Sequence, residues 1–275
     1  MNGEELKKKV RSGGIVYGTM LSMMRSPRWA TPMAGFGLDF VIIDTEHTPR
    51  GRAEVADLIV AMQGTGIVPI TRIPIPASHH VTMAIDAGAQ GILAPYCETV
   101  EEVKDVVGAT KWRPLKGALV RRVMDTGEFP SGASKKYLEE RNKNNVCLIG
   151  IESPPAIDNL ENILKVPGID AIFVGPNDLT ISLGIPDQYD HPKYLEAVRR
   201  VIKTCKKHGV PTLVHHHSVE LTAQWLKEGA RFVLHGSDAR LMHNAVRAAF
   251  GELKAIGEKL SGQSAGDIGE SDEVL

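Results

Sequence analysis

Short apolar runs recur along the chain, and a polar or charged residue closes several of them. An uninterrupted apolar run of this kind is typical of a strand buried on both faces of a parallel sheet. The pattern predicts eight strands, at residues 15–20, 39–43, 67–72, 90–95, 146–152, 170–175, 210–215 and 231–235.

Helical stretches separate most of these runs. We expect helices at residues 52–63, 80–87, 100–109, 156–164, 192–208 and 219–228, and a longer helix at 241–260. Alternating strands and helices imply right-handed crossovers between parallel strands. The α/β pattern and the length of 275 residues together predict one TIM (β/α)8 barrel, a fold that commonly uses about 250 residues.

Residues 111–145 break the alternation. We expect an extra strand at 118–120 and a helical piece at 134–141, and we interpret the segment as an excursion over the functional site between the fourth and fifth strands. Residues 1–260 are assigned to a single catalytic domain. Residues 261–275 are small, polar and acidic, which predicts a disordered tail.

Composition excludes several classes of partner. The 32 Lys and Arg residues nearly balance the 33 Asp and Glu residues, so the chain lacks the basic field that attracts nucleic acid or anionic lipid. No segment approaches the roughly 18 apolar residues of a membrane span. The cysteines number 3 and lack metal-type spacing, which indicates reduced thiols and a cytoplasmic protein.

Ionisable residues stand where four of the predicted strands end. Glu152 and Asp178 follow two strands that are neighbours along the chain, and their oxygens suit a hard divalent cation such as magnesium. Such a cation keeps further positions for the oxygens of a small oxo acid. The alternative is that Glu152 caps the following Ser-Pro-Pro turn and Asp178 caps the following helix.

His47 and Arg72 end two earlier strands. A guanidinium group can stabilise a developing oxyanion, and a histidine can transfer protons near neutral pH. Equally, His47 fits a satisfied turn residue and Arg72 fits a surface ion pair.

Taken together, these segments resemble the metal-dependent (class II) pyruvate aldolases of the HpcH/HpaI type, the 4-hydroxy-2-oxoheptanedioate aldolase family. The resemblance runs in order from Gly18 to Phe250. Its motifs are Asp44-Thr45-Glu46-His47-Thr48-Pro49, Arg72, Ile85-Asp86-Ala87-Gly88-Ala89-Gln90, Ile151-Glu152-Ser153 and Val174-Gly175-Pro176-Asn177-Asp178-Leu179, followed by Ser182-Leu183-Gly184-Ile185-Pro186-Asp187. It implies a barrel of the phosphoenolpyruvate/pyruvate-domain type.

The resemblance also implies a reaction and a metal. The enzyme would reversibly cleave a 4-hydroxy-2-oxo acid to pyruvate and an aldehyde, with Mg²⁺, Mn²⁺ or Co²⁺ held by Glu152 and Asp178. Arg72 would hold the pyruvate enolate oxygen. His47, oriented by Asp86, would be the acid-base group.

Other residues receive supporting roles by the same resemblance. Asp44 and Glu46 would support the residues that contact the metal and the substrate. The pyruvate pocket would be shaped by Gly175, Pro176 and Asn177. Relatives exchange their last helix between subunits, so we expect a homo-oligomer, a hexamer, held partly by the helix at 241–260.

Three features depart from the family. Thr45 replaces a glycine that is common in relatives, and Gly150 replaces a polar side chain two residues before Glu152. His215, His216 and His217 stand where relatives are apolar around the pyruvate methyl group. Strand alternation sends His215 and His217 to one side and His216 to the other. They could be polar fillers of the strand end or metal ligands. Alternatively, one of them, with His215 as the substrate-binding candidate, could face the substrate and have a specificity or proton-transfer role.

Four other basic residues are less specific candidates for the functional site. His79 and His80 fit solvent-facing positions at a helix start, and Arg121 and Arg122 could either contact a distal carboxylate of the aldehyde or face solvent on the excursion.

Two alternatives to the aldolase remain. The same enolate site would serve oxaloacetate decarboxylation or a citramalyl-type lyase reaction. A barrel can also be a non-catalytic small-molecule sensor. The presence of all four candidate residues, Glu152, Asp178, Arg72 and His47, argues against that reading.

Overall fold

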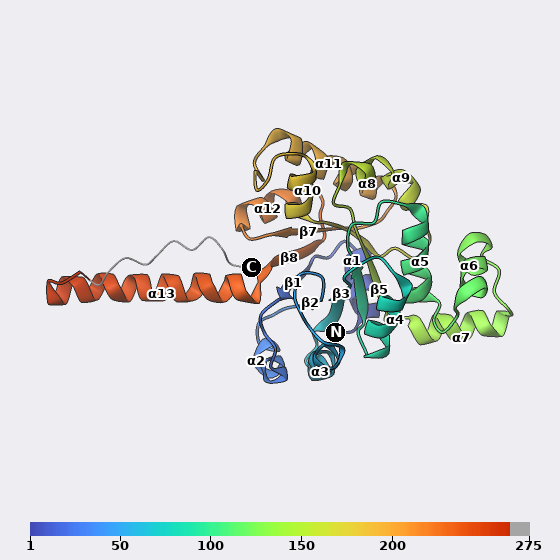
Figure 1. The fold of residues 1–275 in the computed structure, drawn as a ribbon, viewed down its shortest axis with the longest axis horizontal. Coiled ribbons are helices and arrows are strands. Elements are labelled where there is room, and N and C mark those ends of the chain that lie inside the picture. The colour runs from blue at the N-terminus through green and yellow to red at the C-terminus, as the bar shows by residue number, and fades with distance from the viewer. Residues whose placement is uncertain (265–275) are drawn as a thin grey trace.

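In the computed structural model, which describes residues 1–264, eight parallel strands close a barrel. The strands pair in chain order, and the last closes the barrel against the first (Figure 1). Their bounds are β1 Val16–Leu21, β2 Phe40–Asp44, β3 Val68–Arg72, β4 Gly91–Ala94, β5 Val146–Gly150, β6 Ala171–Val174, β7 Thr212–His216 and β8 Phe232–Ser237. The predicted TIM barrel and its eight strands are confirmed.

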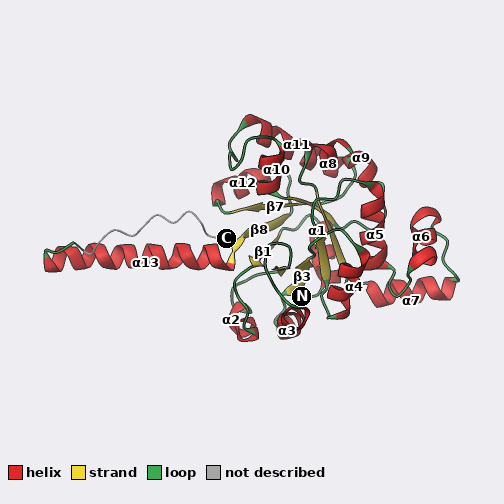
Figure 2. Cartoon of the chain, viewed as in Figure 1, coloured by secondary structure: helices red, strands yellow, loops and turns green. Residues whose placement is uncertain are grey.

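Helices surround the barrel (Figure 2). The predicted helices correspond to α3 Arg52–Met62, α4 Ser78–Asp86, α5 Val100–Lys111, α11 Pro192–Lys207, α12 Val219–Glu228 and α13 Asp238–Ser261, and to the successive short helices α8 Pro154–Asp158 and α9 Leu160–Ile163. The hydrophobic pattern does not reveal some short helices with few apolar residues, namely α1 Gly3–Arg11, the 3-10 helix η1 Pro27–Trp29, α2 Ala30–Met33 and α10 Pro176–Ser182.

Alternate side chains of each strand point into the barrel. In β2, Phe40 and Ile42 belong to the inner core, whereas Val41 and Ile43 pack outward against the helices. The two-residue period of a strand produces this division. Leu6 of α1 joins the inner core near the beginnings of the strands. The inner positions at the opposite strand ends remain for polar side chains.

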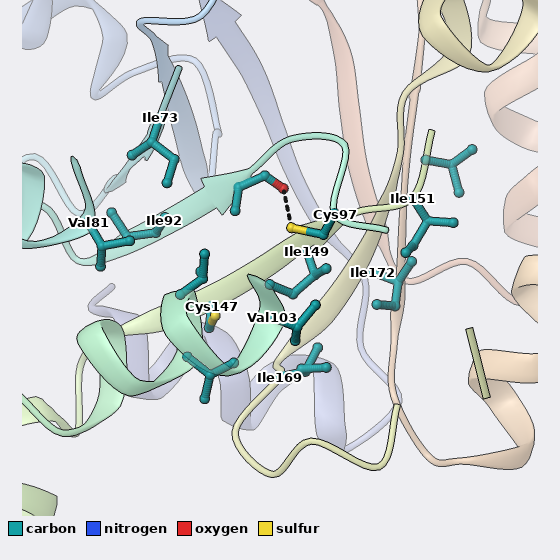
Figure 3. Packing of buried hydrophobic residues seen from close by; sticks show 14 of the residues in the cluster. Ile73, Val81, Ile92, Cys97, Val103, Cys147, Ile149, Ile151, Ile169 and Ile172 are labelled. Carbon is teal, nitrogen blue, oxygen red and sulfur yellow. Dashed lines mark hydrogen bonds between the residues drawn. The ribbon is translucent and has the colours of Figure 1, made fainter. Parts of the chain in front are cut away.

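The outer core lies between the barrel wall and the helices (Figure 3). Ile149 and Ile172, from neighbouring strands, belong to it together with Val103 of α5. Cys97 also lies in this layer, with its Sγ 3.9 Å from the carbonyl oxygen of Ala94. The chain's cysteines are all buried and free, namely Cys97, Cys147 and Cys205.

The expected strand at 118–120 is wrong, because these residues lie in helix α6, Gly117–Thr126. Val120 and Met124 are four residues apart and therefore share one face of this helix. Both side chains lie against Gly108 of α5. A three-residue apolar run is compatible with strand and helix alike, and packing against α5 decides for the helix.

The position expected for this segment is also wrong. The helical piece expected at 134–141 lies within α7, Gly132–Asn142, and both α6 and α7 follow α5 and pack outside it (Figure 1). Lys7 of α1 donates to the carbonyl oxygen of Lys143 at 2.6 Å, so α7 ends beside the amino-terminal end of the barrel. The excursion therefore does not cover the carboxyl ends of the strands.

The long helix α13 projects from the barrel (Figure 1). Its first residue, Asp238, is buried and accepts hydrogen bonds from the backbone N–H groups of Met23 at 3.0 Å and Met24 at 2.5 Å. The hydroxyl of Ser22 donates to the same carboxylate at 2.8 Å. These bonds fix the loop after β1 to the start of α13.

Along its length, α13 has large exposed apolar side chains, at Leu241, Met242, Val246, Phe250, Leu253, Ile256 and Leu260. Of the tail expected at 261–275, Ser261 ends α13, and residues 265–275 lie outside the described residues. Within residues 1–264, no helix combines the length and the apolar character that crossing a membrane requires.

Candidate functional site

A cavity of about 800 Å³ opens at the carboxyl ends of the strands. Eight of the predicted site residues line it, namely Asp44, His47, Arg72, Gly175, Pro176, Asn177, Asp178 and His215. In TIM barrels this end of the sheet carries the active site. The cavity is therefore the candidate active site.

Asp44 and Arg72 reach the cavity because strand alternation turns them inward. Asp44 follows the inner-core residue Ile42 of β2 by two positions, and Arg72 follows the inner-core residue Ile70 of β3 by two positions. Arg72 is 6% exposed, and its Nε donates to Asp44 Oδ1 at 2.7 Å. Its Nη1 lies 2.9 Å from Oε2 of Glu46. The guanidinium group is thus held in one orientation from two sides.

Charge pairing favours the ionised forms of Asp44 and Arg72 in spite of burial. Burial opposes the charged form of Asp44, but the hydrogen bond and charge of Arg72 outweigh it and lower the pKa of Asp44. Burial likewise opposes the charge of Arg72, and Asp44 and Glu46 raise its pKa. For Glu46, burial dominates over the attraction of Arg72 and raises the pKa.

His47 lies at the rim of the cavity, with 60% of its side chain exposed. Its Nε2 is 3.6 Å from Oε2 of Glu46. Asp86, expected to orient it, ends α4, which runs from the carboxyl ends of the strands toward their beginnings, and Asp86 pairs with Arg113. The expected contact between His47 and Asp86 is therefore not made within one chain.

Glu152 is the most strongly perturbed carboxylate of the site. It is 2% exposed, its Oε2 accepts the backbone N–H of Tyr96 at 2.8 Å, and its Oε1 has no hydrogen-bond partner. Burial, and then the negative charge of Asp178, raise the pKa of Glu152 to about 8. A buried carboxylate with an unpartnered oxygen, which also feels the charge of a second carboxylate, favours the binding of a cation.

Two glycines allow the backbone to approach this carboxylate. A Cβ on Gly175 would lie 2.8 Å from Cδ of Glu152. A Cβ on Gly150 would lie 2.9 Å from the carbonyl oxygen of Ala94 and 3.1 Å from the nitrogen of Tyr96. Gly150 therefore leaves room for the loop after β4, which passes over it and brings the N–H of Tyr96 to Glu152. A side chain at this position would collide with that loop.

The residues present fit a divalent cation. Within residues 1–264, no group of three or more His, Cys, Asp or Glu side chains gathers as a ready-made metal cage. Mg²⁺ is commonly held by one or two carboxylates, with water or substrate oxygens completing its shell. Glu152 and Asp178 would supply this smaller donor set, with the unpartnered Oε1 of Glu152 as one ligand.

Strand alternation also divides the histidine run as expected. His215 and His217 line the cavity, whereas His216 is buried on the outer side. The indole N–H of Trp225 donates to Nε2 of His216 at 3.0 Å, and the hydroxyl of Tyr194 lies 3.0 Å from the same nitrogen. Burial lowers the pKa of His216 to about 4, so His216 is a neutral packing residue at neutral pH.

Thr45 causes no strain at its position. The non-glycine residues with positive φ among residues 1–264 are Tyr96 and Asp187, so Thr45 does not need the freedom of a glycine. Its hydroxyl donates to the carbonyl oxygen of Arg72 at 2.6 Å. This departure from the family therefore adds a bond between β2 and β3.

The remaining basic candidates lie outside the cavity. Arg122 pairs with Glu128 on the far side of α5, and Arg121 and His79 line a separate groove formed by α4, α5 and α6. His80 lines a third hollow between α3 and α4. Contact between the arginines and a bound aldehyde would require the expected excursion over the site, which the fold does not have.

Sequence reasoning missed several residues of the site. Tyr189 reaches the cavity from the loop after α10, with its hydroxyl 2.6 Å from Asn177 Oδ1 and 2.8 Å from Asp187 Oδ1. Ser22 and Arg240 line the cavity from the two ends of the barrel chain. Only the closure of β8 against β1 brings the last two together, so no local motif signals them.

Comparison with known proteins identifies the family of this barrel. Residues 19–245 match the HpcH/HpaI aldolase/citrate lyase family. The 2-keto-3-deoxy-L-rhamnonate aldolase of Escherichia coli (strain K12) is 31% identical over 245 residues, which cover 87% of this chain and 89% of that protein. The 5-keto-4-deoxy-D-glucarate aldolase of Klebsiella pneumoniae subsp. pneumoniae is 30% identical over 211 residues, covering 77% and 82%.

A solved structure agrees with these sequences. The HpcH/HpaI aldolase from Desulfitobacterium hafniense DCB-2 matches with a TM-score of 0.78 and 28% identity, over 90% of this chain and 96% of that one. The chain therefore belongs to the HpcH/HpaI aldolase/citrate lyase family and is an aldehyde-lyase of that family.

Proposed function

We propose that this protein reversibly cleaves a 4-hydroxy-2-oxo acid to pyruvate and an aldehyde. The observation that carries the proposal is the buried Glu152, with one unpartnered oxygen beside Asp178, in the same barrel end as the buried Arg72. These residues can hold a cation, an oxo acid and a developing negative charge together.

Glu152 and Asp178 would hold the divalent cation, Mg²⁺, Mn²⁺ or Co²⁺. When bound, such a cation acts as a Lewis acid on the oxygens of a 2-oxo acid. Gly175 and Pro176 line the cavity beside these carboxylates, and the backbone of this turn can contact the oxo acid without a side chain in the way.

Arg72 would stabilise the oxygen that becomes negative as the carbon bond breaks. Its Nε is bonded to Asp44 and its Nη1 lies beside Glu46, while the hydrogen-bond partner of Nη2 within residues 1–264 is the sulfur of Met20, at 3.6 Å. The outer edge of the guanidinium group is therefore free for a substrate oxygen. A donor held in place before the reaction needs little reorganisation in the transition state.

His47 would move the proton of the 4-hydroxyl group. It stands at the rim, where the aldehyde end of the substrate enters, and Glu46 lies 3.6 Å from its Nε2. Glu46 would therefore orient His47 within one chain, in place of Asp86.

The names of the relatives suggest the acceptor. The two curated relatives act on 2-keto-3-deoxy-L-rhamnonate and 5-keto-4-deoxy-D-glucarate, whose aldehyde halves carry hydroxyl groups. Asn177, Asp187 and Tyr189 offer polar contacts near the cavity mouth. A hydroxylated aldehyde fits these contacts better than an apolar one.

Oxaloacetate decarboxylation is the second candidate, because loss of carbon dioxide from oxaloacetate also leaves a pyruvate enolate. The buried Arg72 would serve that reaction equally. A panel of 4-hydroxy-2-oxo acids and oxaloacetate, assayed for pyruvate release with and without chelator, separates the two reactions. Turnover of neither would support a sensor. A cytoplasmic location stays a prediction.

We expect Glu152→Ala and Asp178→Ala each to abolish metal-dependent pyruvate release, because each removes one of two protein ligands. Calorimetric titration with Mn²⁺ measures the loss of binding, and circular dichroism checks folding. Asp190→Ala, at an exposed carboxylate outside the cavity, is the matched control. Parent-like metal binding in either site variant would exclude these ligands.

For Arg72→Lys we expect kcat to fall by at least about a hundredfold, because a point charge cannot reproduce the two-sided guanidinium contacts. The fall should appear in kcat more than in the affinity for Mn²⁺. Steady-state pyruvate release measures the first and calorimetry the second. An almost normal kcat would show that Arg72 only joins β2 to β3.

Metal binding should depend on pH through Glu152. Burial and the charges of Asp178 and Glu46 raise the pKa of Glu152 to about 8, against the opposing charge of Arg72. The metal-free protein is therefore protonated there at pH 7, and a cation must displace that proton. Affinity for Mn²⁺ should fall about tenfold per pH unit below this pKa.

The raised pKa of Glu152 also determines how the folding stability of the metal-free protein depends on pH. Between the ordinary 4.5 and about 8, the folded metal-free protein holds a proton that the unfolded chain releases, so this contribution to stability is lost as pH rises across that window. Urea unfolding in chelator, compared with Glu152→Gln, measures it. A parent and a variant with the same pH dependence would contradict the assignment.

We also propose that the chain forms a homo-oligomer, a hexamer, through α13. Its exposed apolar side chains, from Leu241 to Leu260, form more apolar surface than a projecting helix needs in water. Light scattering at micromolar concentration should give a multiple of the 29.9 kDa chain mass. A monomer would refute the proposal.

A further inference from the structure

A groove of about 410 Å³ lies between α4, α5 and α6, separate from the candidate active site. Ser78 and Thr82, four residues apart on one face of α4, form one wall, and Val120 of α6 belongs to the other. Figure 1 shows these helices on the side of the barrel away from α13. We call this hollow the basic groove because of the side chains that line it.

Positive charge dominates the lining of the basic groove. Its cations come from α3, from the loop after α5 and from α6, namely Arg52, Arg113, Lys116 and Arg121. Asp105 is the carboxylate among the lining residues, and it accepts the backbone N–H of Ser78 at 2.8 Å. The groove therefore has more cations than its own carboxylate can balance.

The cations of the groove differ in how they are paired. Arg113 forms an ion pair with Asp86. Within residues 1–264, by contrast, Arg52, Lys116 and Arg121 form no ion pair with a carboxylate. Like charges that share a hollow repel one another, and an acidic partner seated there would relieve this repulsion.

The chain itself contains a segment of matching chemistry, residues 265–275, which lies outside the described residues. Its sequence has no lysine, arginine or histidine, and its carboxylates are Asp267, Glu270, Asp272 and Glu273. Apolar residues accompany them, at Ile268, Val274 and Leu275. The basic groove likewise combines its cations with apolar side chains, those of Met83, Leu115 and Val120. Charge and apolar character therefore match on both sides.

The length of α13 places the groove of the same chain out of reach. This helix has 24 residues and extends about 36 Å, at about 1.5 Å per residue. Residues 265–275 can span at most about 40 Å. A segment that turned back would therefore reach the beginning of α13, and Figure 1 shows the barrel between that point and α4, α5 and α6. A second copy must supply the groove.

We infer that residues 265–275 of one copy bind in the basic groove of a second copy. The carboxylates of the segment pair with Arg52, Lys116 and Arg121, and its apolar residues cover the apolar part of the lining. The contact uses no residue of the candidate active site, so it is independent of the proposed reaction. It links copies of the chain in addition to the apolar surface of α13.

Carbodiimide cross-linking of the full-length protein tests this contact, because the reagent joins a carboxylate directly to a lysine that lies beside it. Lys116 is the lysine that lines the groove. We expect a covalent dimer on a denaturing gel, at twice the chain mass of 29.9 kDa. Peptide mass spectrometry should find Lys116 joined to a carboxylate of residues 265–275. A cross-link within one chain would leave the mass of a monomer.

Variants separate charge pairing from chance reaction. Arg121→Glu should lower the yield of this cross-link at least about fivefold, because it reverses one cation of the groove. The matched control is Arg122→Glu at the next residue, which pairs with Glu128 outside the groove and should change the yield less than about twofold. Lys116→Arg keeps the charge but cannot react, and should remove the cross-linked dimer. Circular dichroism checks that each variant folds.

Three results would overturn the inference. The first is a parent that gives no cross-link between Lys116 and residues 265–275. The second is an equal yield at Lys203, an exposed lysine of α11, which would indicate random collision. The third is an equal loss of cross-linking in Arg121→Glu and Arg122→Glu.

A small anion is the alternative occupant of the basic groove. Calorimetric titration with inorganic pyrophosphate tests it. Binding that Arg121→Glu abolishes, in a parent without the Lys116 cross-link, would show a small-anion site and refute the contact between copies. An oligomer in light scattering that lacks this cross-link would leave assembly through α13 standing and refute the role of residues 265–275 alone.

Discussion

The site depends on a carboxylate that is buried beside another negative charge. Glu152 lies under the loop that follows β4, accepts one backbone N–H, and has an oxygen with no partner. Desolvation alone would drive such a group to take up a proton, and the charge of Asp178 adds to that tendency. A bound cation relieves both penalties at once. Gly150 and Gly175 make this arrangement sterically possible, since a side chain at either position would collide with the loop or with Glu152.

The barrel supplies the rest of the geometry through the two-residue period of its strands. Inner positions near the strand beginnings are apolar and form a closed core, and the same positions at the strand ends carry Asp44, Arg72 and His215. A polar group there is accessible to a ligand and is supported from below by tightly packed side chains. Loops and helix starts then add the groups that need freedom, such as His47 at the rim and Asp178 in the first turn of α10.

Much of this could be predicted from the sequence because the information is local. Apolar runs locate the strands, and alternation divides His215 from His216. Features that depend on distant parts of the chain could not be predicted. Asp238 is tied to Ser22 only because β8 meets β1, and the Tyr96 N–H reaches Glu152 only through the close approach at Gly150. The prediction of a strand at 118–120 was wrong because packing on α5, and not the apolar run itself, decides the conformation of these residues. The family resemblance suggested Asp86 as the partner of His47, whereas α4 directs Asp86 away from the cavity of its own chain.

The central claim is that this barrel end stabilises a pyruvate enolate, whatever acceptor it uses. Nuclear magnetic resonance of pyruvate in D₂O tests it without any aldehyde, because each passage through the enolate exchanges a methyl hydrogen for deuterium. With Mg²⁺ the protein should remove the pyruvate methyl signal, and chelator or Glu152→Ala should stop the exchange. A methyl signal that persists in the presence of protein and metal, at the rate seen with metal alone, would contradict the account.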